Sequence, residues 1–383
     1  MGKLEKYFQI YRFYSGIRSI MKNFTKQFPL LEQYTYLNTA ASGLLPEEVL
    51  EFRQDHDLDL LVSGSILREQ QGKLLAKVRE SVGGLFNCAP NQVALTPNFS
   101  YGFNTLMEGV STLKKVLLLE NDYPSINWAV ESRGFEVCHA RIDEYLESNI
   151  SAAMAEHKPD ILAFSLVQYI NGIKIDLEFL SRLKLDYPDL LIFADGTQFC
   201  GTEAFDFETS GIDVLGASGY KWMNAGYGNA FFFFKESVAG KVAPKSLGFN
   251  SLQGKYKPQE GNFIGRFEPG HQDTLNFGSL TAAVQLIRKI GMDSIEAKVK
   301  SLAMEAKLAF EKEELLEPSV ILRGLHSSIF NIKGNEALFQ HLNQHNIICS
   351  QRGEGIRISF HYFNTSNDLD KLMEVLKKWK KKR

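Results

Sequence analysis

The sequence predicts an α/β protein in which a mainly parallel sheet lies between helices and a smaller α+β domain is attached. The first observation is that short apolar runs alternate with helix-length segments, as in a parallel sheet with helical crossovers. The second is the length of 383 residues, which suggests one large domain with a smaller companion. The third is a long helical pattern that begins near Gly278 and opens a region of α+β type.

The sheet of the large domain is predicted from six apolar runs. They are Val93–Thr96, Val116–Glu120, Ile161–Val167, Leu190–Asp195, Val214–Ser218 and Ala230–Lys235. A helical pattern precedes them from about Glu47 to Cys88 and opens at Pro46, a residue type that the first helical turn tolerates. Helix-length segments lie between several of the runs, among them 149–157 and 177–186. These elements assign residues 46–277 to a large α/β domain.

The small domain is predicted from the last third of the chain. The helical pattern from Gly278 reaches about Glu314, and a strand, a helix and a strand follow at 327–332, 336–344 and 355–361. A closing helix begins near Ser366 or Asn367, which are both suitable N-cap residues. We expect residues 21–45 to pack here, so that 21–45 and 278–383 form the small domain. Residues 1–20 are an N-terminal extension whose role the sequence does not define.

Composition and charge are those of an ordinary soluble globular protein, with 44% hydrophobic and 23% charged residues. The formal net charge of -2 gives no overall attraction to nucleic acid or to an anionic membrane, so neither is an expected partner. No apolar run approaches the roughly 20 residues that span a bilayer, and the N-terminus lacks the apolar core of a signal peptide. The cysteines lie far apart without a CxxC motif, which favours reduced thiols in a cytoplasmic protein over disulfides or a metal site.

The candidate functional residues lie where the predicted strands end. Ligands of such sheets bind at the carboxyl ends of the strands, so we expect the active site there. These end residues are Thr96, Glu120, Val167, Asp195 and Ser218. Lys221 follows closely after Ser218. A lysine and a carboxylate at neighbouring strand ends suit pyridoxal phosphate, which needs an amine for its Schiff base and an anion to keep its pyridine nitrogen protonated. The pair Asp195 and Lys221 therefore predicts an enzyme.

Two further motifs extend the pattern towards both ends of the chain, namely Tyr36–Ala41 and Arg357–Thr365. Together with the segments around Asp195 and Lys221, they resemble the class V aminotransferase group of fold-type I pyridoxal-phosphate enzymes. That group includes cysteine desulfurases, kynureninases and isopenicillin-epimerase-like proteins. The resemblance covers nearly the whole chain and implies the fold-type I architecture with pyridoxal 5'-phosphate as cofactor.

The resemblance implies a phosphate-binding turn within 96–104, at the start of a helix. The backbone N–H groups of Phe99 and Ser100 and the Ser100 hydroxyl would bind the phosphate there. Ser218 and Tyr220 would hold the same phosphate from the segment before the lysine. The alternative for Ser100 is a plain helix-capping role.

The resemblance also assigns residues to the pyridine ring. Tyr123 would stack on the ring, Asp195 would pair with its N–H, and Gln198 would hydrogen-bond its phenolic oxygen. Lys221 would form the Schiff base and then act as general base and acid, which a buried lysine of lowered pKa can do. The expected catalytic residues are thus Lys221, Asp195 and Tyr123, although packing is the alternative role for the tyrosine.

Substrate contacts are implied at both ends of the chain. Arg357 matches the arginine that grips the α-carboxylate, for which a planar guanidinium is suited. Asn38, Ala40 and Tyr169 are also expected at the substrate, with a core position as the alternative for Tyr169. Arg352 is a second candidate for the carboxylate, or a solvated loop residue.

A partner subunit is implied as well. The segment Arg266–His271 aligns with a loop that, in relatives, reaches the partner's phosphate through a Gly-Thr pair. Here His271 replaces the threonine and Thr274 lies three residues on, so both are candidates for that contact. We therefore expect a homodimer with shared active sites.

The reaction type is narrowed by what the sequence lacks. Desulfurases need a mobile cysteine shortly before the carboxylate-binding arginine, whereas residues 350–354 contain none and Cys349 lies in an apolar run, which argues against desulfurase activity. Gln198 and the compact length favour an aminotransferase that converts a small amino acid to a keto acid. Tyr123, Tyr169 and Tyr220 favour a kynureninase-like hydrolase or lyase, or an epimerase. A cofactor-bound regulator is the non-enzyme alternative. We predict the aminotransferase.

Overall fold

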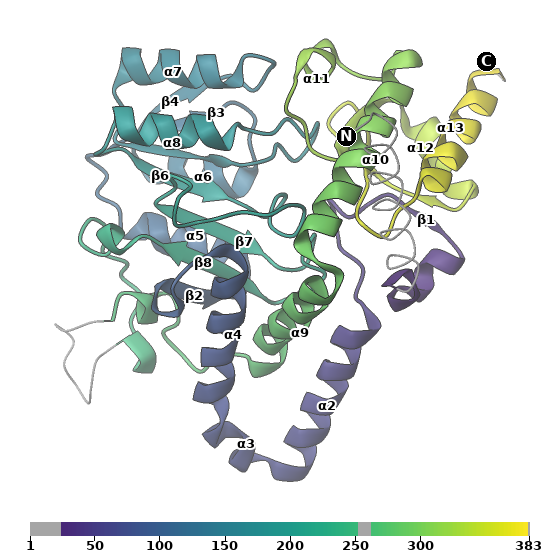
Figure 1. Cartoon of the computed structure of the whole chain (residues 1–383). Helices are drawn as coiled ribbons and strands as arrows, with labels where there is room; N and C mark the ends of the chain where they lie inside the picture. The colour runs from purple at the N-terminus through teal and green to yellow at the C-terminus, as the bar shows by residue number, and fades with distance from the viewer. Residues whose placement is uncertain (1–23, 252–261, 382–383) are drawn as a thin grey trace, which may run out of the picture.

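The structure is a computed structural model that describes residues 24–251 and 262–381 (Figure 1). Its centre is a seven-stranded sheet of order β2-β8-β7-β6-β5-β3-β4. The strands are β2 (Val93–Thr96), β3 (Lys115–Leu119), β4 (Glu136–Ala140), β5 (Ile161–Ser165), β6 (Leu191–Asp195), β7 (Val214–Ser218) and β8 (Ala230–Phe234). Only β8 runs against the others in this sheet. The predicted α/β class with a mainly parallel sheet is confirmed.

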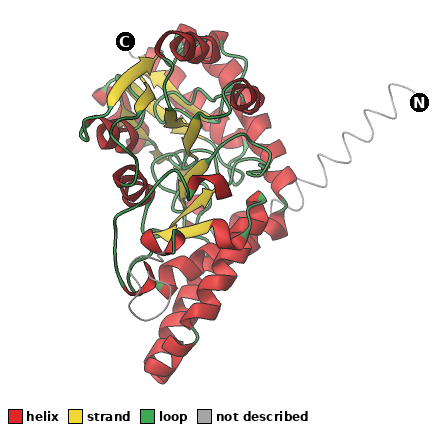
Figure 2. Ribbon diagram, turned by 90° about the vertical axis from the view of Figure 1, so that its left-hand side faces the viewer, coloured by secondary structure: helices red, strands yellow, loops and turns green. Residues whose placement is uncertain are grey.

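Helices cover both faces of the sheet, as Figures 1 and 2 show. One face carries α5 (Phe99–Glu108) and α6 (Pro124–Glu131), and the other carries α7 (Leu146–His157) and α8 (Leu177–Asp186). The strands are apolar on both sides because both faces are buried. Along β3, Val116 and Leu118 point into one hydrophobic cluster, and Leu117 and Leu119 point into the other.

Strand β4 was not predicted, although the six predicted runs all form strands with ends shifted by at most two residues. The segment Glu136–Ala140 reads Glu-Val-Cys-His-Ala, and its first four residues are partly or fully exposed. It lies at the edge of the sheet and pairs only with β3. An edge strand buries less of its surface, so the apolar signal that marks the central strands is missing here.

Two long predicted helices are each divided at a glycine. The pattern 47–88 forms α2 (Glu47–Ser63), α3 (Ser65–Glu69) and α4 (Gln71–Phe86), and the chain turns at Gly64, whose φ is +51°. The pattern 278–314 forms α9 (Thr274–Ile290) and α10 (Met292–Lys312), separated by Gly291 with a φ of +88°. Both angles lie where glycine is favoured. Helices α2 and α4 project from the body and meet at α3 (Figure 1).

The C-terminal region holds the small sheets. Strands β9 (Ile329–Lys333), β11 (Ser350–Arg352) and β12 (Gly355–Ser359) form an antiparallel sheet of order β11-β12-β9. The helices α11 (Pro318–Leu322), α12 (Glu336–Gln344) and α13 (Ser366–Lys381) accompany it. Short 3-10 helices occur at 25–27, 29–32, 90–92, 236–238, 249–251 and 264–266.

Strand β1 (Thr35–Tyr36) pairs with β10 (Ile347–Ile348), so the N-terminal segment contacts the C-terminal region as expected. The division into 46–277 against 21–45 and 278–383 stays a prediction, and residues 1–20 lie outside the described part of the chain. In that described part, no helix is long and apolar enough to cross a membrane.

Candidate active site

Three neighbouring strands of the sheet end at one edge and supply the centre of the site. They are β5, β6 and β7, whose last residues are Ser165, Asp195 and Ser218. Lys221 follows β7 in a turn and is 6% exposed, while Asp195 is 5% exposed. The predicted convergence of a carboxylate and an amine at adjacent strand ends is therefore present in the fold.

The environment of Asp195 raises its pKa to about 6, because burial penalises the carboxylate. Hydrogen bonding to Thr197 and the charge of Lys221 oppose this effect. The Thr197 backbone N–H donates to Asp195 Oδ1 over 2.8 Å, and the Thr197 hydroxyl accepts from the Ser218 N–H over 3.1 Å. Thr197 thus ties the carboxylate to the neighbouring strand, a role that the sequence prediction missed.

Lys221 lies between two aromatic rings. Its Nζ is 5.7 Å from the ring centre of Tyr123 and 5.6 Å from that of Tyr220. Burial lowers the pKa of Lys221 to about 8, and the charges of Arg357 and Arg352 act in the same direction against that of Asp195. A lysine with this pKa is partly neutral near physiological pH, as a proton-abstracting amine must be.

Hydroxyl groups gather at the N-terminus of α5. The Phe99 N–H donates to Ser218 Oγ over 2.9 Å, and the hydroxyls of Ser100 and Ser125 are 2.6 Å apart. Asn98 caps the helix by accepting from the Tyr101 N–H, so capping is not the role of Ser100. Free N–H groups and a partial positive charge make such a helix start suitable for a phosphate. Ser125 is a polar member of this cluster that the sequence prediction did not assign.

Tyr123 is positioned by a buried carboxylate. Asp122 accepts from the Tyr123 N–H with Oδ1 and from the Ser165 N–H with Oδ2, each over 2.7 Å. The ring of Tyr123 meets the ring of Tyr169 edge-on at 5.4 Å between centres. The structure therefore brings Tyr123, Tyr169 and Lys221 together. Asp122 was not singled out from the sequence, although it lies just beyond the strand end at Glu120.

Gln198 is held by a chain of buried hydrogen bonds. Its Nε2 donates to the Ala40 carbonyl oxygen over 2.9 Å, and its Oε1 accepts from the Trp222 indole N–H over 2.7 Å. Because an indole N–H can only donate and a carbonyl can only accept, the orientation of the Gln198 amide is defined. Within the described parts of the chain, no acceptor is found for the second hydrogen of this amide nitrogen.

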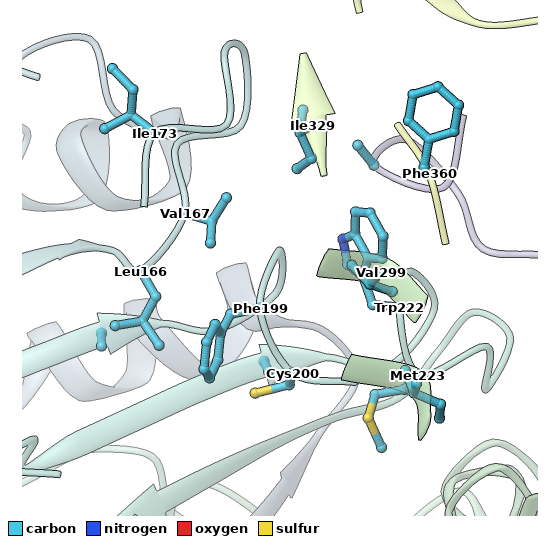
Figure 3. Close-up of a cluster of buried hydrophobic side chains, with 14 of the residues drawn as sticks. Leu166, Val167, Ile173, Phe199, Cys200, Trp222, Met223, Val299, Ile329 and Phe360 are labelled. Atoms are coloured by element: carbon cyan, nitrogen blue, oxygen red, sulfur yellow. The ribbon is translucent and has the colours of Figure 1, made fainter. Parts of the chain in front are cut away.

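Trp222 itself is part of a hydrophobic cluster that includes Phe199, Ile329 and Phe360 (Figure 3). Its backbone carbonyl oxygen lies 2.9 Å from His361 Nε2. Burial lowers the pKa of His361 to about 3, so this histidine is neutral. Trp222 and His361 were not predicted as site residues, although both lie inside the quoted motifs.

The N-terminal segment 38–44 covers the lysine turn. Ala40 N–H donates to Ser359 Oγ over 3.0 Å, and Asn38 Oδ1 accepts from the Ser350 hydroxyl over 2.6 Å. Gly43 lies so close to the turn that a β-carbon there would be 1.9 Å from the Lys221 carbonyl oxygen. Asn38 and Ala40 are thus near the predicted site, in contact with the sheet that carries Arg357.

Arg357 is a buried cation on β12, 3% exposed. Its Nη1 donates to the Tyr169 carbonyl oxygen over 2.7 Å, while its Nε is buried and has no hydrogen-bond partner among the residues that the structure describes. Burial lowers its pKa to about 10, and the nearby charge of Arg352 adds to this. In the described part of the chain, no carboxylate lies within 4 Å of the Arg357 guanidinium. A buried arginine of this kind suits an anionic ligand.

His271 and Thr274 contact residues of the projecting helices. Arg68 lies 3.1 Å from His271 Nε2, and the Thr274 hydroxyl lies 2.8 Å from His56 Nε2. Neither contact involves the residues around Lys221. Their predicted role at a partner's phosphate stays a prediction.

The cysteines all have raised thiol pKa values, with burial as the main cause. The pKa is about 12 for Cys88 and Cys349, and it is also raised for Cys138 and Cys200. Cys349 is buried as predicted, with 6% of its surface exposed, but the prediction that it is a strand residue was wrong, because it lies between β10 and β11. Burial and a raised pKa are typical of an inert thiol. Among the described residues, no group of three or more His, Cys, Asp and Glu side chains is arranged to hold a metal ion.

Comparisons with known proteins agree on the family but not on a reaction. An uncharacterized aminotransferase, YcbU of Bacillus subtilis, is 22% identical over 91% of this chain and 95% of its own length. Isopenicillin N epimerase of Amycolatopsis lactamdurans is 24% identical over 94% and 98%. The structure of a cysteine desulfurase from Thermococcus onnurineus superposes with a TM-score of 0.83 at 17% identity, covering 94% of this chain and 98% of that one.

Two further relatives, 21% and 22% identical, are named probable cysteine desulfurases, which runs against the prediction that argued against this reaction. The names of these relatives therefore leave the specific activity of this chain open. The model of the family named Aminotransferase class-V matches residues 35–372. The chain thus belongs to the class V aminotransferase family of pyridoxal-phosphate-dependent enzymes.

Proposed function

We propose that the protein is an aminotransferase that acts on a small amino acid with pyridoxal phosphate as cofactor. The observation that carries this proposal is the buried setting of Lys221, whose Nζ lies 5.7 Å and 5.6 Å from the ring centres of Tyr123 and Tyr220 and close enough to Asp195 to feel the charge of its carboxylate. Arg357 adds a buried guanidinium that forms no ion pair with any carboxylate of the described residues. An amine, an anion for a ring nitrogen and a cation for a carboxylate are the groups that this chemistry requires.

The residues present fit the cofactor. Three hydroxyls gather near the start of α5, namely those of Ser100, of Ser125 on α6 and of Ser218 at the end of β7. Together with the backbone of Phe99, they would hold the phosphate. Tyr220 lies beside Lys221 and would add its hydroxyl.

The ring would be held by other residues. Tyr123 would cover one face, Asp195 would face the ring nitrogen, and the free hydrogen of the Gln198 amide would point to the phenolic oxygen. Bound pyridoxal phosphate supplies an aldehyde carbon for amino groups and a ring that accepts electrons.

The chain supplies orientation and proton transfer. Arg357 would fix the α-carboxylate by a two-point contact, since a planar guanidinium matches a carboxylate. Lys221 Nζ would then take the proton from the substrate Cα and return it as general acid. Because burial lowers its pKa to about 8, the fraction of neutral amine rises as the pH increases through 8. The rate of proton abstraction is expected to rise over the same range.

Two other reactions use the same groups. The edge-on pair of Tyr123 and Tyr169 beside Lys221 favours a kynureninase-like cleavage at the β-carbon or an epimerisation, because both positions resemble the kynureninase version of this site. Desulfurase activity would need an accessible thiolate near the substrate. The raised pKa and burial of Cys349 argue against that, despite the desulfurases among the relatives.

The test is the visible spectrum of the cofactor-loaded protein during mixing with single amino acids, kynurenine included. A lasting loss of the visible band of the lysine-bound cofactor, with release of a keto acid, supports transamination. Return of the band with alanine released from kynurenine, or with an inverted amino acid, refutes it in favour of the alternatives. If Lys221→Ala left the cellular phenotype intact, the protein would act as a cofactor-bound regulator instead.

We also propose a homodimer. Several large apolar side chains are exposed on the projecting helices α2 and α3, namely Leu58 (57%), Leu61 (79%), Val62 (80%) and Ile66 (64%). Contiguous exposed apolar surface is typical of a protein interface. His271 and Thr274 lie against the same helices and would extend from there to the partner's phosphate.

Light scattering tests the dimer. Leu61→Glu is expected to shift the protein to monomer, whereas Leu113→Glu, at a residue that is 94% exposed near β3, is expected to leave the mass unchanged. A wild-type monomer at micromolar concentration that retains the cofactor would refute the dimer.

A further inference from the structure

The small sheet β11-β12-β9 has one apolar and one polar face. Phe330, Ile332, Ile356 and Ile358 are all fully buried on the first. Arg357 lies on the second, because successive side chains of a strand point to opposite faces. The polar face looks towards the active site, since Arg357 bonds to the Tyr169 carbonyl.

The strand register places a second arginine on this polar face. Ser350 pairs with Arg357 across β11 and β12, and Arg352 pairs with Gly355. Directly opposed residues share a face, and so do residues two apart on one strand. Arg352 is therefore the diagonal neighbour of Arg357. Ser350 bonds to Asn38, which confirms that this face meets the segment covering the lysine turn.

The turn after Arg352 rests on the loop that carries Tyr169. Gly353, with a φ of +55°, lies against Ile170, and a β-carbon at Gly353 would be 3.2 Å from Ile170 Cγ2. The tip of the β11–β12 hairpin and the loop beside Tyr123 and Lys221 are thus in contact. Arg352 stands at the exposed end of the polar face and Arg357 at its buried end.

The polar face of the small sheet carries the positive charges of Arg352 and Arg357 close together. Two like charges at diagonal positions of a sheet oppose each other. Arg352 lies close enough to contribute, after burial, to the lowered pKa of both Arg357 and Lys221. Its Nη1 donates only to the carbonyl of its own neighbour, Gln351, over 2.9 Å. Within 24–251 and 262–381, no carboxylate forms an ion pair with Arg352 or Arg357.

We infer that Arg352 binds an anionic group on the side chain of the substrate, so that the preferred substrates are acidic amino acids. This inference rests on the proposed function. One α-carboxylate is matched by Arg357 alone, and its binding leaves the charge of Arg352 without a counterion. A carboxylate on the substrate side chain supplies that counterion at the open end of the site. The same charge disfavours basic side chains, since like charges there repel.

The experiment compares isosteric substrates in three proteins. L-glutamate is paired with L-glutamine, and L-aspartate with L-asparagine, for the cofactor-loaded wild type, Arg352→Gln and Arg141→Gln. Arg141 is an exposed arginine of the large domain and serves as the charge-matched control. The measurements are KM and kcat, with the apparent Kd from the cofactor spectrum as an independent binding readout.

We expect the wild type to prefer each acid over its amide. In Arg352→Gln, KM and Kd for the two acids rise about 10-fold, which corresponds to the loss of one charge-assisted hydrogen bond to a partly exposed group. The kcat for the acids, and all values for the amides, change less than about 3-fold. Arg141→Gln matches the wild type. Equal effects on acids and amides, or a wild type that prefers the amides, overturn the assignment of Arg352 and leave the proposed function intact. If the loaded wild type reacts with none of the four, while other amino acids do react, the acidic specificity is wrong. If no amino acid reacts at all, the proposed function itself fails.

Discussion

Replacing Trp222 by phenylalanine tests the hydrogen bonds that hold Gln198 in the site. Trp222 is 1% exposed and Gln198 is 6% exposed, so water does not reach their contact freely. The substitution keeps an aromatic ring but removes the indole N–H, which is 2.7 Å from Gln198 Oε1 and is the one donor to that oxygen among the described residues. A buried acceptor left without a partner costs about 1 to 3 kcal/mol, and the space left by the smaller ring adds to this.

We therefore expect Trp222→Phe to lower the free energy of unfolding by about 2 to 4 kcal/mol. The assay is urea unfolding of the cofactor-free protein, which separates folding from cofactor affinity. Trp128→Phe is the matched control, because Trp128 is 69% exposed on α6 and its replacement is expected to stay within about 0.5 kcal/mol.

A double-mutant cycle with Gln198→Leu isolates the hydrogen bond from the change in ring size. The coupling energy between the two positions is expected at about 0.5 to 3 kcal/mol, as for residues in direct contact. The reasoning is refuted if Trp222→Phe costs no more than Trp128→Phe. It is also refuted if Trp222→Phe costs the same whether or not Gln198 is present.

Three other perturbations test the core, the lysine turn and the pH response. Arg79→Gln removes the ion-pair partner of the Glu268 carboxylate, which is 5% exposed, and is expected to cost about 3 to 5 kcal/mol in urea unfolding. Gly43→Ala places a carbon 1.9 Å from the Lys221 carbonyl oxygen, so lower stability and weaker cofactor retention are expected in unfolding and spectral assays. His361 has a folded pKa of about 3, below the unfolded value of 6.5. Between pH 6.5 and pH 3, His361 is protonated in the unfolded chain but not in the folded one. The free energy of unfolding therefore declines as the pH falls from 6.5 towards 3. The slope is up to about 1.4 kcal/mol per pH unit, and His361→Asn is expected to reduce it.

Each of these changes has a control on the surface. Lys378→Gln breaks an exposed ion pair with Glu374 and is expected to change stability by less than about 1 kcal/mol. Gly240→Ala meets no atom within 4 Å and should be tolerated. His139→Asn makes the same replacement at an exposed histidine of β4 and serves as the matched control for His361→Asn. A buried-site variant that behaves like its control contradicts the contact on which its prediction depends.

The strands of the central sheet could be predicted because burial on both faces requires uninterrupted apolar runs. Val214–Ser218 and Val93–Thr96 are observed with the predicted bounds. The edge strand β4 could not be predicted in this way, since Glu136 and His139, which point to opposite faces of the strand, are both exposed and interrupt the apolar run. The helices are interrupted at Gly64 and Gly291, where the φ angle is positive. Glycine can adopt such an angle but does not require it, so the presence of a glycine alone did not predict the interruption.

The fold class and the placing of Asp195 beside Lys221 could be predicted from the sequence, because local apolar runs and their first polar residues locate the strand ends. The distant side chains that support this pair are seen only once the chain is folded. Trp222 orients Gln198, Asp122 holds the Tyr123 backbone, and Arg357 reaches the Tyr169 carbonyl across 188 residues of sequence. Such contacts depend on strand order, register and the packing of the small sheet against the large one. These are properties of the whole chain, which no local pattern of residues encodes.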